Sequence, residues 1–115
     1  MQFNIQKTLD NTIKLSGIGL HSGNTVDLVI KPAPENFGIK FCRIDINKND
    51  YIAANYLNVV DPVLCTKIKN KNGASVSTVE HLMAAFFGEG IDNALVEVNS
   101  SEIPILDGSA NDFVE

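Results

Sequence analysis

Residues 77–88 read Ser77-Thr78-Val79-Glu80-His81-Leu82-Met83-Ala84-Ala85-Phe86-Phe87-Gly88. Five apolar side chains recur here at the spacing of one helical face, namely Val79, Leu82, Met83, Phe86 and Phe87. Burying them is worth on the order of 8–15 kcal/mol as an upper bound. Ser77 suits an N-cap, Glu80 then stands at the third position of a capping box, and Gly88 ends the segment. The pattern predicts a helix with one buried face.

The residues before this helix alternate between polar and apolar, which is typical of half-buried strands. In residues 3–15 every apolar side chain falls on an odd position, and Asp10-Asn11 either turns the chain or lies within a continuous strand. A second alternating run covers residues 26–30 and is ended by Pro32. Residues 39–46 predict a third strand.

The rest of the chain completes the predicted architecture. Residues 47–62 are weakly patterned and form either an insertion or a long loop, whereas Asn72-Gly73 is a strong hairpin signal. Strands are expected at residues 94–98 and 103–106, and a second helix near Ser109. Hairpins followed by helices predict an α+β fold, a two-layer sandwich whose mostly antiparallel sheet has two helices on one face.

The helix face opposite the apolar stripe is unusual for a surface. His81 points there, beside Thr78, Ala84 and Ala85, and Glu80 is the only charged residue between positions 78 and 87. Small side chains around a histidine indicate that another element packs against this face. Two interpretations of Glu80 remain open at this point: a capping partner, or a functional group acting together with His81.

Composition limits the classes of function. A chain of 115 residues with a formal net charge of -5 is one domain by size, and its acidity argues against nucleic acid as a partner. The two cysteines, Cys42 and Cys65, lie in apolar runs and are expected to be buried thiols. Residues 1–7 alternate polar and apolar, and no run reaches the length of a transmembrane helix, so we expect a cytoplasmic protein without a membrane span.

Four motifs together carry a family resemblance over nearly the whole chain. They are Gly17-Ile18-Gly19-Leu20-His21-Ser22-Gly23, Ser77-Thr78-Val79-Glu80-His81-Leu82, Gly90-Ile91-Asp92-Asn93 and Glu102-Ile103-Pro104-Ile105-Leu106-Asp107-Gly108-Ser109. In this order they closely resemble the UDP-3-O-acyl-N-acetylglucosamine deacetylase family of lipid A biosynthesis. The resemblance implies that residues 1–115 are the amino-terminal domain of a zinc-dependent hydrolase that removes an acetyl group from a UDP-acyl-amino-sugar.

The resemblance implies roles for two neighbouring side chains. His81 would be a Zn²⁺ ligand, and Glu80 would be the general base that takes a proton from the metal-bound water. Zinc lowers the pKa of such a water to about 7, and a carboxylate one residue from a ligand can reach it.

Four further residues have a functional and a structural interpretation each. By resemblance His21 would lie at the edge of the active site, but it could instead hydrogen-bond within the glycine-rich turn. Asp107 would support the site, or else belong to a turn into a helix capped by Ser109. Leu64 and Cys65 match a family segment that lines the substrate passage, although a strand core explains both equally well.

The family plan also implies a partner domain that this sequence does not contain. The remaining two zinc ligands would come from a His-x-x-x-Asp motif, and the general acid from another histidine, both in a second domain. Here Thr25 and Ala85 stand four residues after the two histidines. The expectation is therefore a chain that is inactive alone. The alternatives are a non-catalytic binding or scaffold module of the same fold and one half of a split enzyme.

Overall fold

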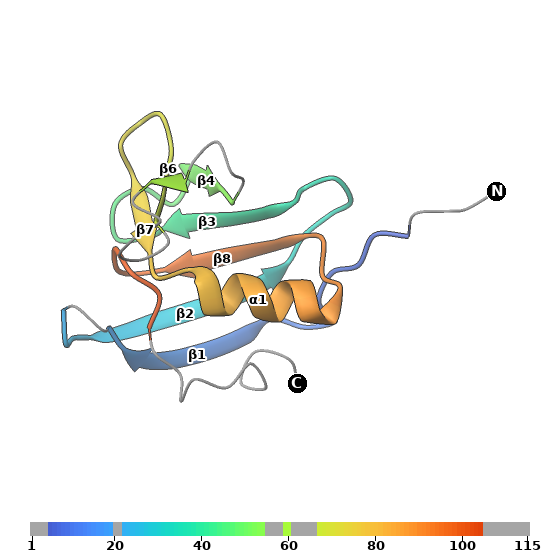
Figure 1. Ribbon diagram of the computed structural model, residues 1–115, viewed down its shortest axis with the longest axis horizontal. Helices are drawn as coiled ribbons and strands as arrows, with labels where there is room; N and C mark the ends of the chain where they lie inside the picture. Colours follow the sequence, from blue (N-terminus) through green and yellow to red (C-terminus); the bar gives the residue numbers. More distant parts are fainter. Residues whose placement is uncertain (1–4, 20–21, 55–58, 61–66, 105–115) are drawn as a thin grey trace.

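The computed structural model describes residues 5–19, 22–54, 59–60 and 67–104 (Figure 1). These residues form eight strands and one helix: β1 (Ile13–Ile18), β2 (Thr25–Pro32), β3 (Ile39–Arg43), β4 (Tyr51–Ala53), β5 (Val59–Val60), β6 (Lys67–Lys69), β7 (Ser75–Ser77), α1 (Glu80–Glu89) and β8 (Ala94–Val98).

The larger sheet contains five strands in the order β1-β2-β8-β3-β4. Neighbouring strands run antiparallel except β3 and β8, which are parallel. β8 therefore inserts between β2 and β3, two strands that precede it by more than fifty residues. The predicted mostly antiparallel sheet is confirmed, with this parallel pair at its centre.

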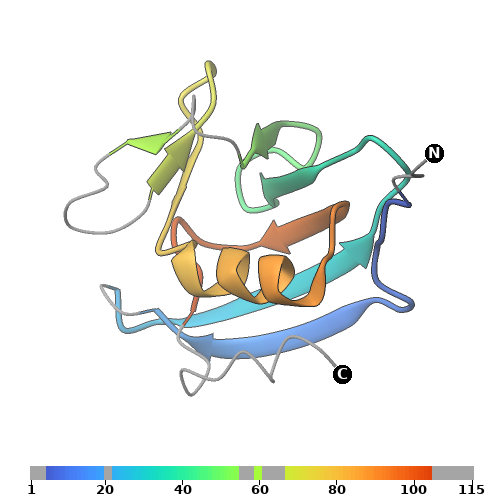
Figure 2. The ribbon, with the colours of Figure 1, turned by 45° about the vertical axis from the view of Figure 1, so that its right-hand side comes forward.

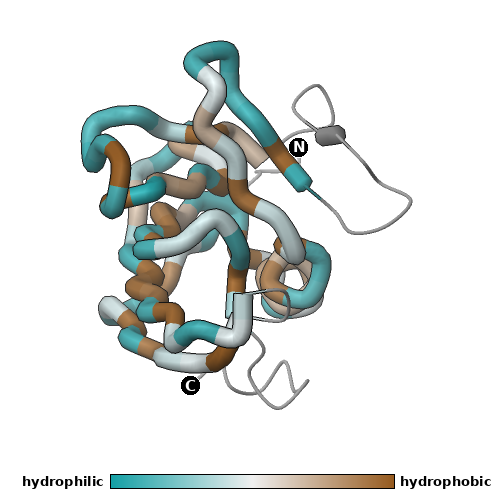
Figure 3. The backbone as a smooth tube through the Cα atoms, turned by 90° about the vertical axis from the view of Figure 1, so that its left-hand side faces the viewer, coloured by the Kyte–Doolittle hydropathy of each residue, from teal (hydrophilic) through white to brown (hydrophobic). Residues whose placement is uncertain are grey.

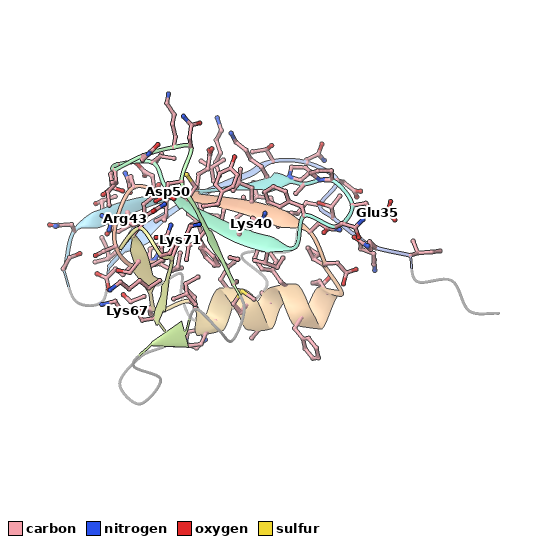
Figure 4. The ribbon with its side chains drawn as sticks, turned by 90° about the horizontal axis from the view of Figure 1, so that it is seen from above. Glu35, Lys40, Arg43, Asp50, Lys67 and Lys71 are labelled. Atoms are coloured by element: carbon pink, nitrogen blue, oxygen red, sulfur yellow. The ribbon has the colours of Figure 1, made fainter. Side chains whose placement is uncertain are left out.

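One face of this sheet is covered by α1, and no described helix or strand covers the other, which we call the open face of the sheet (Figures 1 and 4). Because strand side chains alternate between faces, Val26, Leu28 and Ile30 of β2 are all fully buried. They share one core cluster with Leu82 and Phe86 of α1. The intervening positions face away from the helix, and there Lys31 Nζ lies 3.0 Å from Glu97 Oε1. Figure 3 shows the resulting alternation of hydrophobic and hydrophilic residues along the sheet.

The smaller sheet has the order β5-β6-β7 and lies beside the larger one (Figure 2). The hairpin predicted at Asn72-Gly73 is confirmed: it joins β6 to β7, and Gly73 has a φ of 93° that favours glycine. The Asn70 side chain organises the turn, since its Oδ1 accepts the backbone N–H groups of Asn72 and Ala74 at 3.0 Å.

Several boundaries differ from the sequence expectation. The first strand begins at residue 13, because the chain bends at Asp10-Asn11, and the third ends at Arg43 in a turn. The weakly patterned residues 47–62 contain two short strands, β4 and β5. No strand covers Ile103 and Pro104, where Glu102 instead forms a single bridge to Ser77.

The α+β class is confirmed, with strands dominating and α1 packed on the sheet. The second helix, expected near Ser109, falls outside the described residues. Within the described part of the chain, no helix has the length and apolarity needed to cross a membrane.

Candidate functional site

The connection from β7 to α1 is the most unusual stretch of backbone next to the predicted Glu80-His81 pair. Thr78 has a φ of 62°, a left-handed conformation that β-branched residues rarely adopt. Its hydroxyl oxygen is buried and finds no hydrogen-bond partner in the described part of the chain. Buried hydroxyls usually have partners, and strained backbone clusters at functional sites. The start of α1 therefore stands out on structural grounds.

The predicted capping box does not form. α1 begins at Glu80 with Val79 as its N-cap, and Val79 makes no side-chain cap hydrogen bond. Ser77 belongs to β7, because it pairs with Lys67 on one side and bridges to Glu102 on the other. Its hydroxyl donates to the carbonyl oxygen of Ser101 at 3.2 Å. Glu80 is thus the first helical residue rather than the third, and the capping-box interpretation of it is wrong.

Glu80 and His81 occupy the first turn of α1 in different surroundings. Glu80 is half-buried and His81 is exposed. A carboxylate in the first turn interacts favourably with the helix dipole, typically by about 0.3–1 kcal/mol. Since successive helical side chains diverge by about 100°, the carboxylate and the imidazole lie side by side without facing each other.

The apolar stripe of α1 is confirmed for Val79, Leu82 and Phe86, which are buried, but Phe87 is 89% exposed. Phe87 follows buried Phe86 and so points about 100° further round the helix. Ala85, which was expected on the His81 face, is buried instead.

The face of α1 that remains open carries His81, Ala84 and Phe87, and we call it the open helix face. The helix also extends beyond the predicted end at Gly88. It closes at Gly90, whose φ of 70° is the left-handed C-cap conformation.

A buried carboxylate is connected through a backbone bridge to the strand that leads into this helix. Glu102 is 3% exposed, and its Oε1 accepts the backbone N–H of Ser22 at 3.0 Å. Its backbone is bridged to Ser77, three residues before Glu80. Glu102 thereby connects the glycine-rich segment after β1 with the strand that enters α1. Sequence reasoning quoted Glu102 only as part of a motif and assigned it no role.

Four predicted site residues cannot be compared with the structure. His21, Leu64, Cys65 and Asp107 lie outside the described residues. Of the sequence-predicted site, the structure therefore describes Glu80 and His81 alone, and their roles stay predictions.

The Gly90–Asn93 motif has a structural role at the other end of α1. Asp92 Oδ2 accepts the backbone N–H of Lys7 at 2.9 Å. The buried Asn93 side chain accepts the backbone N–H of Gly38 at 2.8 Å and donates to Gln6 Oε1 at 2.8 Å. These hydrogen bonds attach the amino-terminal segment to the sheet. They account for the polar side chains of Asp92 and Asn93 without a role in ligand binding.

The described residues do not complete a metal centre by themselves. Among them, no group of three or more His, Cys, Asp and Glu side chains is arranged to hold a metal ion. A hollow lies instead near the end of α1, lined by Ile5, Gln6, Lys7, Thr8, Ala33, Glu35 and Asn93. It is separated from Glu80 by the length of the helix.

Comparisons with known proteins agree on one family. Residues 6–115 match the family described as LpxC: UDP-3-O-acyl N-acetylglycosamine deacetylase. Over 109 residues the chain is 53% identical to the UDP-3-O-acyl-N-acetylglucosamine deacetylase of Chromohalobacter salexigens, 51% to that of Xylella fastidiosa and 50% to that of Mannheimia succiniciproducens. Each match covers 95% of this chain and 36% of the relative. The chain thus spans about a third of the length of the curated relatives it matches.

Proposed function

The chain belongs to the UDP-3-O-acyl N-acetylglycosamine deacetylase family, and we propose that it contributes Glu80 and His81 to the active site of a zinc-dependent deacetylase. The substrate would be a UDP-3-O-acyl-N-acetylglucosamine, as in the names of the relatives, and the product an intermediate of lipid A biosynthesis.

The observation that supports the proposal most is the placement of the pair. His81 is exposed on the open helix face, so its imidazole is accessible to a metal ion, and the carboxylate of Glu80 is its immediate neighbour. Nitrogen and carboxylate groups are donors that zinc accepts. The donor set therefore fits zinc, with His81 as a ligand. Bound zinc would acidify a water molecule and polarise the substrate carbonyl.

Glu80 is suited to the proton transfer. In the reaction, a water oxygen adds to the carbonyl carbon of the acetamide, the C–N bond breaks, and acetate and a free amine are formed. Glu80 would take the proton that the water loses, a general-base role worth roughly a hundred- to ten-thousand-fold in rate. Its direction, about 100° from His81 around the helix, suits a base better than a second ligand to the same ion.

The rest of the site would come from the part of the protein beyond this chain. One imidazole leaves a catalytic zinc short of its usual three protein ligands. We propose that a second domain supplies the other ligands and the acid that protonates the amine, and that it covers the open helix face. Phe87, exposed beside His81 and Ala84, would then be buried in the interface.

Two variants of the full-length protein separate the proposed roles. Glu80→Ala should lower the turnover number at least about a hundredfold while zinc content stays near that of the unmodified protein. His81→Ala should lower both turnover and zinc content, because it removes a ligand. Glu89→Ala is the matched control, since it removes a carboxylate from the exposed last residue of the same helix.

Melting temperatures must be recorded for all three variants, so that unfolding is not taken for loss of chemistry. Turnover of Glu80→Ala within a few-fold of normal would exclude Glu80 as the base. Normal zinc content in His81→Ala would exclude His81 as a ligand. Continuation of the reading frame past Glu115 into a His-x-x-x-Asp motif would separate the enzyme from a scaffold module or a split protein.

A further inference from the structure

The carboxylate of Glu102 meets the turn between β1 and β2 at Ser22 and Gly19. The turn is closed by two backbone hydrogen bonds, from Gly19 to Asn24 and from Gly23 to Gly19, each 2.9 Å. Glu102 Oε1 accepts the N–H of Ser22, a residue eighty positions earlier. Burying a carboxylate is costly unless hydrogen bonds compensate for the lost water. This placement is therefore specific, and we call Gly19 together with residues 22–24 the glycine corner.

Gly19 shows how closely the two parts fit. A Cβ atom at this position would clash with Glu102 Oε1 and would lie 2.6 Å from Ser22 Oγ. The described glycines with positive φ include Gly23, whose φ is 72°, but not Gly19. Glycine is thus required at position 19 by the contact with Glu102, and at position 23 by backbone conformation.

The backbone of Glu102 is attached to the entry of α1. Ser77 donates its N–H to Ser101 at 2.8 Å and accepts the N–H of Ile103 at 3.0 Å, so that Glu102 lies between two bonds to one residue. Thr78, with its left-handed backbone, is the next residue along the chain. Glu80 follows two residues later as the first residue of α1. Figures 1 and 2 show the segment after β8 running past the start of α1 toward the β1–β2 end of the sheet.

We propose that Glu102 is a positioning residue that holds the glycine corner at a fixed place relative to the first turn of α1. Its backbone is fastened to the strand entering the helix, and its side chain to the corner. The corner is then held at a constant position relative to the strand that leads into the helix carrying Glu80 and His81. This inference rests on the proposed function for its effect on turnover, but the anchoring itself is a property of the fold.

The first experiment uses the full-length protein with Glu102→Ala, Glu102→Gln and Glu97→Ala. Glu97 is a matched control, because it is a carboxylate on β8 that pairs with Lys31 on the open face of the sheet. We expect Glu102→Ala to speed hydrogen exchange of the Ser22 amide about tenfold or more, and to lower kcat about tenfold or more through misplacement. Zinc content should be unchanged. Glu102→Gln retains an oxygen acceptor for Ser22 and should recover most of both quantities, and Glu97→Ala should change neither.

The second experiment tests the contact with Gly19. Gly19→Ala alone should disturb the corner, because its methyl group meets the carboxylate. In the double variant Gly19→Ala with Glu102→Ala the carboxylate is gone, so the added methyl group should cost little further. The loss of Ser22 protection in the double variant should then be clearly smaller than the sum of the losses in the two single variants.

The outcomes distinguish the anchoring from the chemistry. Ser22 exchange that is unchanged in Glu102→Ala, or additive effects in the double variant, would overturn the anchoring. Faster exchange with unchanged kcat would overturn the positioning role. If Glu102→Ala does not fold, Glu102→Gln decides: protection and turnover near normal support the proposal, and turnover as low as that of Glu80→Ala opposes it. A wild-type protein without deacetylase activity would contradict the proposed function while the exchange rates still test the anchoring.

Discussion

Thr78 is the clearest case of a residue whose structural peculiarity is invisible in the sequence. Next to Ser77 it suggests an ordinary helix start, whereas the structure gives it a φ of 62° and a buried hydroxyl with no partner among the described residues. A conformation of this kind costs of order 1–3 kcal/mol and persists only where the surroundings enforce it. The sheet bonds of Ser77 on one side and the helix on the other provide that enforcement. The strain lies two residues before the proposed base.

Cys42 leads to a prediction on pH dependence. Burial, and secondly the charge of Glu97, raise the pKa of the Cys42 thiol. In the unfolded chain a thiol ionises near pH 8.5, so above this pH the unfolded state releases its proton first and is stabilised. The contribution of Cys42 to the free energy of unfolding should therefore be constant below about pH 8 and decline as the pH rises toward 10.

Urea unfolding at several pH values checks this. Cys42→Ala should be less stable than the wild type by about 1 kcal/mol near pH 7 and should lack the part of the alkaline decline that Cys42 causes. Replacing Cys65 instead serves as the control and should leave that part in place. Parallel declines in the wild type and Cys42→Ala would show that the thiol is not the titrating group.

In α1, two adjacent phenylalanines provide a matched pair. Phe86 is fully buried in the core, and Phe87 is 89% exposed. In the isolated chain, Phe86→Ala should lower the free energy of unfolding by about 3–5 kcal/mol, and Phe87→Ala by less than about 0.5 kcal/mol. Phe87→Ala should also reduce binding of an apolar dye and self-association, because it removes the largest side chain of the open helix face.

The same pair tests the proposed second domain. In the full-length protein Phe87→Ala should cost more stability than in the isolated chain, because the phenyl ring would there be covered. Equal costs in both contexts would mean that the open helix face stays exposed to water.

The elements themselves were largely predictable, and their arrangement was not. Alternation predicted β2, the Asn72-Gly73 turn signal predicted the β6–β7 hairpin, and a strand was expected at residues 94–98, because such signals depend on neighbouring residues. The start of α1 was placed too early, since Ser77 is held by sheet bonds to residues 67 and 102 that no local pattern contains. Phe87 was assigned to the core because the pattern cannot tell which edge of an apolar stripe meets the sheet.

For the molecule as a whole, the prediction concerns metal affinity. The isolated chain should bind Zn²⁺ weakly and hydrolyse no substrate, because His81 is the one ligand that the family resemblance assigns to it. A complete structural zinc site yields about 10–16 kcal/mol, and one imidazole retains only a minor part of that. Titration calorimetry on metal-free chain, paired with a deacetylation assay, measures both quantities. Submicromolar affinity in a monomer, or turnover near that of the full-length protein, would show that the site is complete within these residues.

The part of the candidate site that consists of neighbouring residues in the sequence could be predicted. Glu80 and His81 stand together in one motif, and the structure places them together at the first turn of α1. The connection through Glu102 could not be predicted, because it joins Ser22 to a carboxylate eighty positions later, and a single sequence does not reveal which distant residues meet. His21, Leu64, Cys65 and Asp107 remain predictions.

The central place of β8 also bears on how the protein is made. On the ribosome, β1 to β4 emerge well before residues 94–98, yet β2 and β3 are neighbours only through β8. Until that strand appears, the nascent chain holds two separate hairpins, each with an unpaired edge that can bind the wrong partner. Among the strands that the structure describes, the last to be synthesised is the one that closes this sheet. Chaperones that shield strand edges should therefore matter most in the interval between the emergence of β4 and that of β8.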